Sequence, residues 1–388
     1  MSEIKQGYKQ TKVGIIPEDW EIVKLGKLTT VETGKTPLRS NKQFWDNGTI
    51  NWATTTEVNE TYIVSTNEKI TNQAVAELKM KILPINTILL AMYGQGKTRG
   101  KVALLRIEST INQAFASIKP NKNYSTNFIF NYLDKSYEKI RDLSHGSNQD
   151  NLNLDIVKAL QIPLPPLKEQ EKIAEILTTW DEAITKQTEL LEAKELQKKA
   201  LMQKLLSGEV RFDGFSDKWE EVRIDKLFDF KKGQELSKEK LEKNGIFECI
   251  LYGELYTTYS EVISEIKSKT NIKEGIKSKI DDILIPASTT TSAIDLAIAS
   301  TIQKDNVLIG GDINILRKKT NNINGEFISK YLTHIKKMEI AKYAQGITII
   351  HLYSKDFKHL KIQLPSLPEQ QKIAEVLSLA DDEINLLK

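Results

Sequence analysis

The stretch LPPLKEQEKIAEILTTWDEAI (residues 164–184) recurs as LPSLPEQQKIAEVLSLADDEI (residues 364–384), and this repeat decides how the rest of the chain divides. Twelve of the 21 positions are identical at an offset of 200 residues, and no gap is needed. The same offset relates further identical pairs upstream: Gly146 and Gly346, Leu152 and Leu352, Lys158 and Lys358, Leu160 and Leu360, and Ile162 and Ile362. A period of 200 residues is the size of a domain, not of a solenoid unit. The sequence therefore predicts two tandem domains of one design.

Each unit also begins alike, because DWEIVKLGKL (19–28) resembles KWEEVRIDKL (218–227) at an offset of 199. Between these ends the sequences diverge, and residues 29–145 share little with residues 228–345 beyond their apolar rhythm. Both variable regions contain two strand-like runs and then a helix-like segment: 87–92, 101–107 and 127–140 in the first, and 282–287, 296–302 and 326–340 in the second. This pattern predicts α+β architecture, with two mixed α/β domains in tandem. Similar flanking segments around two dissimilar central regions suit a protein whose two domains recognise different targets.

A long helix is expected after each domain. The first runs from Glu169 to Ser207, 39 residues or roughly 58 Å, and Gly208 ends it. Its apolar residues recur at spacings of three and four, which predicts a partner-binding stripe continued in the second helix: Ile173, Leu177, Trp180, Ile184, Leu191, Ile373 and Leu377. A helix of this length with one apolar side is not stable alone. We therefore expect the two helices to pair as an antiparallel coiled coil.

The second helix is short. It has about 20 residues, roughly 30 Å, before Lys388, and nothing in it corresponds to LEAKELQKKALMQKLLSG (191–208). Either the chain is shortened at its C-terminus or a partner completes the bundle. The expected divisions are a first domain, a long helix, a second domain and a short helix, at residues 1–165, 166–208, 209–365 and 366–388.

Composition limits the class of protein. Apolar residues make up 40% and charged residues 28% of the 388 residues, as in a globular protein, and a net charge of +3 is only mildly basic. Cys249 is the sole cysteine, which excludes an internal disulfide and a Cys-rich zinc site. The polar N-terminus lacks the apolar core of a signal peptide, and no apolar run reaches 18 residues. The sequence predicts a cytoplasmic protein without a membrane partner.

These features together resemble the specificity subunits of type I restriction–modification systems. The resemblance rests on IPEDWEIVKL (16–25), on LPPLKEQEKIAEIL (164–177) and on LPSLPEQQKIAEVL (364–377). It covers essentially the whole chain in the family's order, in which a variable region and a constant region alternate twice. The duplicated helix start after each divergent domain is its most specific element.

The resemblance implies a function without an active site in this chain. Each variable region would be a target-recognition domain that reads one half of a split sequence in double-stranded DNA. The helices would set the spacer between the halves and dock two DNA-methyltransferase subunits, to which restriction subunits can add. S-adenosylmethionine and ATP would be bound by those partners, so no cofactor is expected in this chain.

In the first domain the loop between the two strand-like runs is the best candidate for DNA contact. Arginine and glutamine suit bidentate contacts to guanine and adenine, while lysine mainly neutralises phosphate. The candidates combine cations, an amide and an aromatic ring within nine residues: Tyr93, Gln95, Lys97, Arg99 and Lys101. A solvated hairpin tip is the alternative for this loop. Lys35 and Arg39, in a polar loop after the first strand, are weaker candidates, as are Asn148 and Gln149 after Gly146.

In the second domain the corresponding loop, STTTSA (288–293), is uncharged. Hydroxyl groups can hydrogen-bond to phosphates or bases, although such runs are usually only loops. The remaining candidates follow the first strand or flank Gly346, so that the full set for this domain is Lys231, Lys232, Gln234, Tyr252, Thr289, Thr290, Thr291, Gln345 and Thr348.

No catalytic or metal-binding pattern is found. The four histidines lack ligand spacing, and the sequence has no G-x-S-x-G motif. PLPPL (163–167) lacks the Asn or Asp of an adenine-methyltransferase loop. AMYGQGKT (91–98) resembles a phosphate-binding loop, but Ala91 replaces its first glycine and a strand-like run follows it.

Two other functions therefore stay open beside the DNA reader. A nucleotide hydrolase would use Lys97 and Thr98 of that loop. A purely structural tandem scaffold would bind protein partners through its helices.

Overall fold

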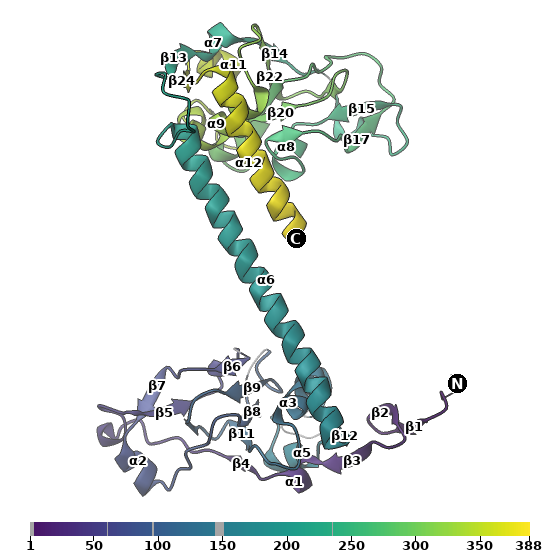
Figure 1. Cartoon of the computed structure of the whole chain (residues 1–388), viewed down its shortest axis with the longest axis vertical. Coiled ribbons are helices and arrows are strands. Elements are labelled where there is room, and N and C mark those ends of the chain that lie inside the picture. Colours follow the sequence, from purple (N-terminus) through teal and green to yellow (C-terminus); the bar gives the residue numbers. More distant parts are fainter. Residues whose placement is uncertain (1–3, 60, 95–96, 144–150, 235) are drawn as a thin grey trace. The chain divides into compact units, whose positions relative to one another are not determined.

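The computed structural model describes residues 4–59, 61–94, 97–143, 151–234 and 236–388. The chain divides into two compact units, Met1–Ile184 and Thr185–Lys388. Both units are mixed α/β, as the sequence predicts (Figure 1).

The first unit is built on a five-stranded sheet in the order β4 (Val31–Thr33), β11 (Phe115–Ile118), β8 (Ile88–Ala91), β9 (Val102–Leu105) and β6 (Tyr62–Ile63). A smaller sheet holds β10 (Thr110–Ile111), β5 (Ile50–Ala53) and β7 (Glu68–Ile70), and β3 (Glu21–Lys24) pairs with β12 (Gln161–Leu164). The other elements are β1 (Tyr8–Thr11), β2 (Gly14–Pro17), α1 (Leu25–Leu28), α2 (Asn72–Glu77), α3 (Thr126–Lys135), α4 (Tyr137–Asp142) and α5 (Leu154–Ala159).

The second unit repeats the topology of the two larger sheets and of the β3–β12 pair. Its five-stranded sheet runs β14 (Phe228–Lys232), β22 (Ile313–Lys318), β18 (Asp282–Pro286), β20 (Ser300–Ile302) and β16 (Val262–Ile263). Its smaller sheet holds β17 (Ser268–Thr270), β15 (Phe247–Ile250) and β21 (Leu308–Ile309), and β13 (Glu220–Arg223) pairs with β24 (Lys361–Leu364). The helices are α7 (Ile224–Leu227), α8 (Glu254–Thr257), α9 (Gly325–His334), α10 (Lys337–Ala341) and α11 (Ser354–Phe357). One strand pair has no counterpart in the described part of the first unit: β19 (Ser288–Thr289) with β23 (Ile350–His351).

The central strands are continuous apolar runs because both faces of the sheet are covered. In the first unit Ile88 and Leu90 face the cluster that includes Phe128 of α3, whereas Leu89 and Ala91 face the cluster beneath the smaller sheet. Successive residues of a strand point to opposite faces, so a strand buried on both sides needs apolar residues at every position.

The repeated motif fixes the start of each long helix. These helices are α6 (Leu167–Ser207) and α12 (Leu367–Leu387). The Gln170 side chain donates to the carbonyl of Pro165 at 2.8 Å and accepts from the backbone N–H of Ser125 at 2.9 Å, at the N-cap of α3. Gln370 repeats these contacts with Pro365 and with Asn324, the N-cap of α9, at the same distances.

The glutamate before each glutamine makes a second anchor. Glu169 accepts from the indole of Trp20 at 3.2 Å, and Glu369 accepts from the indole of Trp219 at the same distance. Arg211 adds a bidentate contact to Glu369 at 2.8 and 2.7 Å. The repeated Glu-Gln pair therefore joins each helix to the domain before it.

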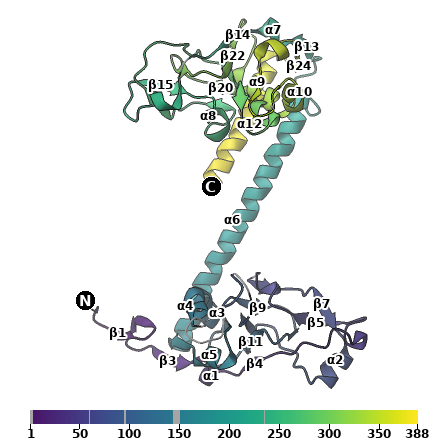
Figure 2. The same ribbon diagram turned by 180° about the vertical axis from the view of Figure 1, so that it is seen from behind.

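Within the second unit, α6 and α12 run antiparallel. Lys198 forms an ion pair with Asp381, Lys194 pairs with Glu383 at 2.7 Å, and the Gln187 side chain donates to the carbonyl of Leu387 at 2.9 Å. The residue numbers fall along one helix as they rise along the other. α12 also lies along α9 on one side of the sheet, as both views show (Figure 1, Figure 2).

The apolar residues predicted to bind partners differ in how exposed they are along the two helices. Trp180 and Ile184 are 65% and 61% exposed, and Leu177 is also exposed. Ile173 is half-buried against the core of the first unit. Leu191 is half-buried as well.

Ile373 and Leu377 correct the prediction. Both are fully buried in the core of the second unit, because α9 and the end of α6 cover that side of α12. They hold α12 to its own domain and present no surface to a separate partner.

Candidate nucleic-acid interface

Four segments of the second unit meet around Asp312, at the turn before β22. Lys232, at the end of β14, forms an ion pair with Asp312 at 3.2 Å. Ser288 of β19 donates a hydrogen bond to the same carboxylate at 3.1 Å. β19 in turn pairs with β23, through Ser288 with His351 and Thr289 with Ile350. The structure therefore brings together segments that the sequence separates by up to 120 positions.

The loop before α11 is closed by its own backbone. The N–H of Gln345 donates to the carbonyl of His351 at 2.8 Å, and the reverse hydrogen bond is 2.7 Å. Gly346 has φ +129°, and a side chain there would collide with the carbonyl oxygen of Ile349, so only glycine fits. The loop presents Gln345 and Thr348 to solvent, with Ile347 99% exposed between them.

The run of threonines begins in a β-strand, because Thr289 belongs to β19. Thr289 is buried in β19, and its hydroxyl is hydrogen-bonded to that of Thr291 at 2.8 Å. Thr291 also donates to Asp295 at 2.5 Å. The expectation of a hydroxyl-rich loop is therefore corrected for Thr289, whose hydroxyl is buried and hydrogen-bonded within the protein. Thr290 is exposed.

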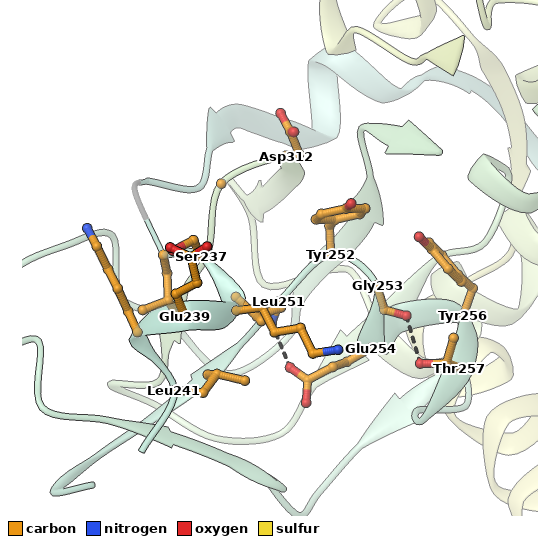
Figure 3. Close-up of a pocket in the computed structure, with 14 residues that line it drawn as sticks. Ser237, Glu239, Leu241, Leu251, Tyr252, Gly253, Glu254, Tyr256, Thr257 and Asp312 are labelled. Atoms are coloured by element: carbon orange, nitrogen blue, oxygen red, sulfur yellow. Dashed lines mark hydrogen bonds between the residues drawn. The ribbon is translucent and has the colours of Figure 1, made fainter. Parts of the chain in front are cut away.

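A pocket of about 970 Å³ lies beside this surface and is shown in Figure 3. Tyr252 and Tyr256 line it, with ring centroids 6.4 Å apart and an edge-to-face arrangement. Glu254 shapes the segment that carries both rings, because its carboxylate accepts from the backbone N–H of Leu251 at 2.7 Å and from Ser268 at 2.5 Å.

The first unit builds the same frame with different side chains. Gly34 and Gly233 follow β4 and β14 at matching places, and a Cβ at either would collide with a backbone carbonyl oxygen. The next residue in each unit donates its N–H to the smaller sheet, Lys35 to Ile111 at 3.0 Å and Gln234 to Ile309 at 3.1 Å. Lys35 and Gln234, both predicted from the sequence, therefore occupy equivalent positions.

Two backbone hydrogen bonds fix a second equivalence. Met92 donates to the carbonyl of Ala114 and accepts from Leu152. Ala287 makes the same two contacts with Asp312 and Leu352. Tyr93 therefore matches Ser288, and Ala114 matches Asp312.

The predicted basic loop of the first unit is partly described. Tyr93 and Lys97 are exposed, and the carbonyl of Lys97 accepts from the hydroxyl of Tyr137 at 2.8 Å. Arg99 and Lys101 are half-buried. Burial, and then the charge of Asp181, raise the pKa of Asp134, while Lys101 opposes this shift. Three further candidates lie outside the described residues: Gln95, Asn148 and Gln149.

The family is shown by comparison with known proteins. A family model for the type I restriction modification DNA specificity domain matches the chain twice, at residues 17–195 and 216–388. The chain belongs to this family. A specificity subunit is not the catalytic part of such a system, and this chain is not itself an enzyme.

Relatives include two specificity subunits of type I restriction enzymes from Methanocaldococcus jannaschii. The MjaIX subunit is 36% identical over 194 residues, which is 48% of this chain and 44% of that protein. The MjaVIII subunit is 23% identical over 398 residues, which is 98% of this chain and 91% of that protein.

Two crystal structures share the fold. The S subunit of a type I restriction–modification system from M. genitalium has a TM-score of 0.55 at 18% identity, covering 95% of this chain and 91% of that one. The HsdS subunit from Thermoanaerobacter tengcongensis has a TM-score of 0.51 at 17% identity, covering 96% and 91%.

One predicted DNA contact of this specificity subunit, Arg39, also makes contacts within the protein. The guanidinium of Arg39 lies 4.0 Å from the ring centroid of Trp45 and 5.1 Å from that of Trp52, and it forms a bidentate ion pair with Glu68. These contacts hold the loop after β4 against the smaller sheet. The two tryptophans nearby in sequence were the signal for this cation–π site.

The lysine candidates differ in whether their ammonium groups contact other groups of the protein. The ammonium of Lys35 donates to the carbonyl of Leu78 at 2.6 Å, and Lys232 is paired with Asp312. Lys231 is exposed on β14. Sequence reasoning missed Asp312, although Gly310 and Gly311 before an apolar strand signal a turn at that place.

The structure does not support the nucleotide hydrolase. After the basic loop comes β9, not the helix whose N-terminus would hold a nucleotide phosphate.

The described residues contain no group of His, Cys, Asp or Glu that could hold a metal ion. Among them, no helix has both the length and the apolar character that a membrane span requires. Burial raises the pKa of Cys249 to about 11, so this thiol is not poised to react.

Proposed function

We propose that this specificity subunit reads a bipartite DNA sequence, one half with each domain, and carries the methyltransferase subunits to it. One observation carries the proposal: matched positions of this surface are held by the same backbone hydrogen bonds in both units and carry unlike side chains. Lys35 in the first unit stands where Gln234 stands in the second, and Ala114 stands where Asp312 stands. Equal frames with unequal hydrogen-bonding groups suit the reading of two different base sequences.

The long helices supply the second part of the proposal. The antiparallel contacts between α6 and α12 support a coiled coil that sets the spacer between the two half-sites. The exposed apolar residues Leu177, Trp180 and Ile184 support a docking role for the first half of α6. We assign this surface to methyltransferase subunits, two per complex, with restriction subunits joining through them.

The proposal also assigns the cofactors to subunits of the complex. S-adenosylmethionine for methyl transfer and ATP for restriction are bound by the partner subunits. This chain contributes the position on DNA at which they act.

The experiment that tests the proposal is methylation mapping. The chain is co-expressed with the methyltransferase subunit of its own system in a host that lacks other adenine methylation. Methylated adenines are then mapped across the host genome. We expect a single bipartite motif, and exchange of residues 29–145 for those of a relative should change one half of it only.

Two results would contradict the proposal. One is the absence of any complex between the chain and the methyltransferase subunit in a mass measurement. The other is a change of both half-sites when only the first variable region is exchanged.

A further inference from the structure

Asp312 is an acidic residue in a surface that the proposed function places against DNA. Its side chain is 44% exposed. Its φ of +58° lies in the left-handed region that few residues other than glycine, asparagine and aspartate adopt. In the first unit the equivalent residue is Ala114. The carboxylate is therefore a property of the second domain, not of the common frame.

The neighbours of Asp312 hold the carboxylate in place and offset its charge. Lys232 contacts one carboxylate oxygen at 3.2 Å, and Ser288 donates to the other at 3.1 Å. An unpaired anion would be repelled by DNA phosphates, and the ion pair reduces this repulsion. An ionised carboxylate has about four acceptor sites, so two protein contacts leave room for further donors.

Asp312 and Tyr252 line the same pocket, in which Figure 3 labels both side chains. Two cations, Lys238 and Lys240, line it as well. The first unit has Thr55 where the second has Tyr252, because Glu57 receives the N–H of Thr54 as Glu254 receives that of Leu251. The carboxylate of Asp312 and the ring of Tyr252 therefore have no counterpart at the equivalent described positions of the first unit.

We propose that Asp312 is a specificity-determining residue of the second domain, whose carboxylate accepts a hydrogen bond from the exocyclic amino group of cytosine or adenine in the major groove. In that groove only these two bases present an amino donor, while guanine and thymine present oxygen acceptors. Lys238 and Lys240 contact the phosphates beside that base. This inference rests on the proposed function and names a group that carries it out.

The test uses the full chain in complex with its methyltransferase subunit and the variant Asp312→Asn. Binding is measured on duplexes in which each position of the second half-site is varied in turn. We expect discrimination at one position to fall by about 10-fold to 100-fold, and the first half-site to be read as before. The base that the unaltered protein prefers at that position shows whether Asp312 contacts cytosine or adenine.

A second readout separates base reading from a structural role. Removal of one negative charge leaves Lys232 free to meet a phosphate. Affinity for unrelated DNA should therefore stay equal or rise, with a salt dependence steeper by up to about 0.9 in log–log slope. A residue that only supported the fold would lower specific and non-specific binding together.

Two further variants complete the experiment. Asp312→Gly removes the carboxylate and suits the positive φ, so it should lose the same discrimination. Asp229→Asn makes the same charge change at the other end of β14, where Asp229 pairs with Lys319 at 3.4 Å, and should leave base preference unchanged.

Unchanged base preference in both Asp312 variants would overturn the inference, as would equal loss at both half-sites with a lower melting temperature. If the unaltered complex recognises no bipartite site at all, the proposed function fails, and this inference fails with it.

Discussion

At the scale of single residues, Gln170 and Gln370 explain why the Glu-Gln pair recurs in the repeat. Each side chain is buried and spans a gap between the start of a long helix and the N-cap of the helix that covers the sheet. No apolar residue of similar size can satisfy a carbonyl and an N–H at once. The glutamine therefore has the same structural role in both domains of this chain.

Gln370→Ala should lower the free energy of unfolding by about 2–3 kcal/mol. It leaves the carbonyl of Pro365 and the N–H of Asn324 without their partner in a buried place. Urea unfolding measures the change. Gln371→Ala, at the exposed neighbouring position, is the control and should stay within about 0.5 kcal/mol of the unaltered protein. Equal effects at both positions would contradict the anchoring role.

Glu261 should make stability depend on acidic pH. Burial alone would raise its pKa, but the hydrogen bond from His334 at 2.7 Å and the charge of Lys330 lower the pKa from 4.5 to about 2. Because the folded-state pKa is depressed, the stabilisation is present above pH 4.5 and is lost as the pH falls toward 2. The loss should be on the order of 2 kcal/mol.

Unfolding free energies measured at about pH 5 and about pH 3 test this for Glu261→Gln, which should show a weaker decline than the unaltered protein. Glu265→Gln serves as the control, because Glu265 is an exposed residue on the following loop. The same decline in all three proteins would rule out Glu261 as the source.

At the scale of elements, Asp381 joins three helices. It pairs with Lys198 of α6 and, at 3.2 Å, with Lys330 of α9, whose side chain is only 2% exposed. Buried lysines need a counter-charge, because the ammonium loses its water when it is buried. The position of α12 against both helices is therefore tied to one carboxylate.

Asp381→Asn should destabilise the protein by about 2–4 kcal/mol, since it removes the carboxylate paired with the buried Lys330 and leaves only the charge of Glu261 to offset that ammonium. Adding Lys330→Met should recover much of this loss, because an apolar side chain of similar volume needs no partner. Thermal and urea unfolding of the single and double variants measure both steps. Asp382→Asn, at the exposed next position, should have little effect. If the double variant is no more stable than Asp381→Asn, burial of the ammonium is not the cause.

At the scale of the whole molecule, the proposed spacer function predicts a change in the DNA target. Two helical turns, about seven residues or 11 Å, are inserted after Lys186, before the contacts of α6 with α12 begin at Gln187. About seven residues return the helix nearly to its starting face. We expect methylation mapping to give the same two half-sites with a spacer longer by about three base pairs. An unchanged spacer would show that α6 does not set the separation.

The sequence by itself determined the features that depend on local pattern. The repeat at 164–184 and 364–384 predicts two equal domains, and apolar spacing predicts the helix that became Leu167–Ser207. These signals can be read along the chain because helix and strand periods are local properties. Lys35 and Gln234 could also be found, since each follows the first strand of its sheet.

Only the tertiary structure decided which of these residues are accessible and which meet. Asp312, Lys232 and Ser288 come together because β14, β19 and the turn before β22 end at one place, although up to 80 positions separate them. Leu377 belongs to the core, whereas Leu177 at the equivalent position of the repeat is exposed, because α9 and the end of α6 pack against α12. Burial depends on what packs against a side chain, and that is a property of contacts distant in sequence.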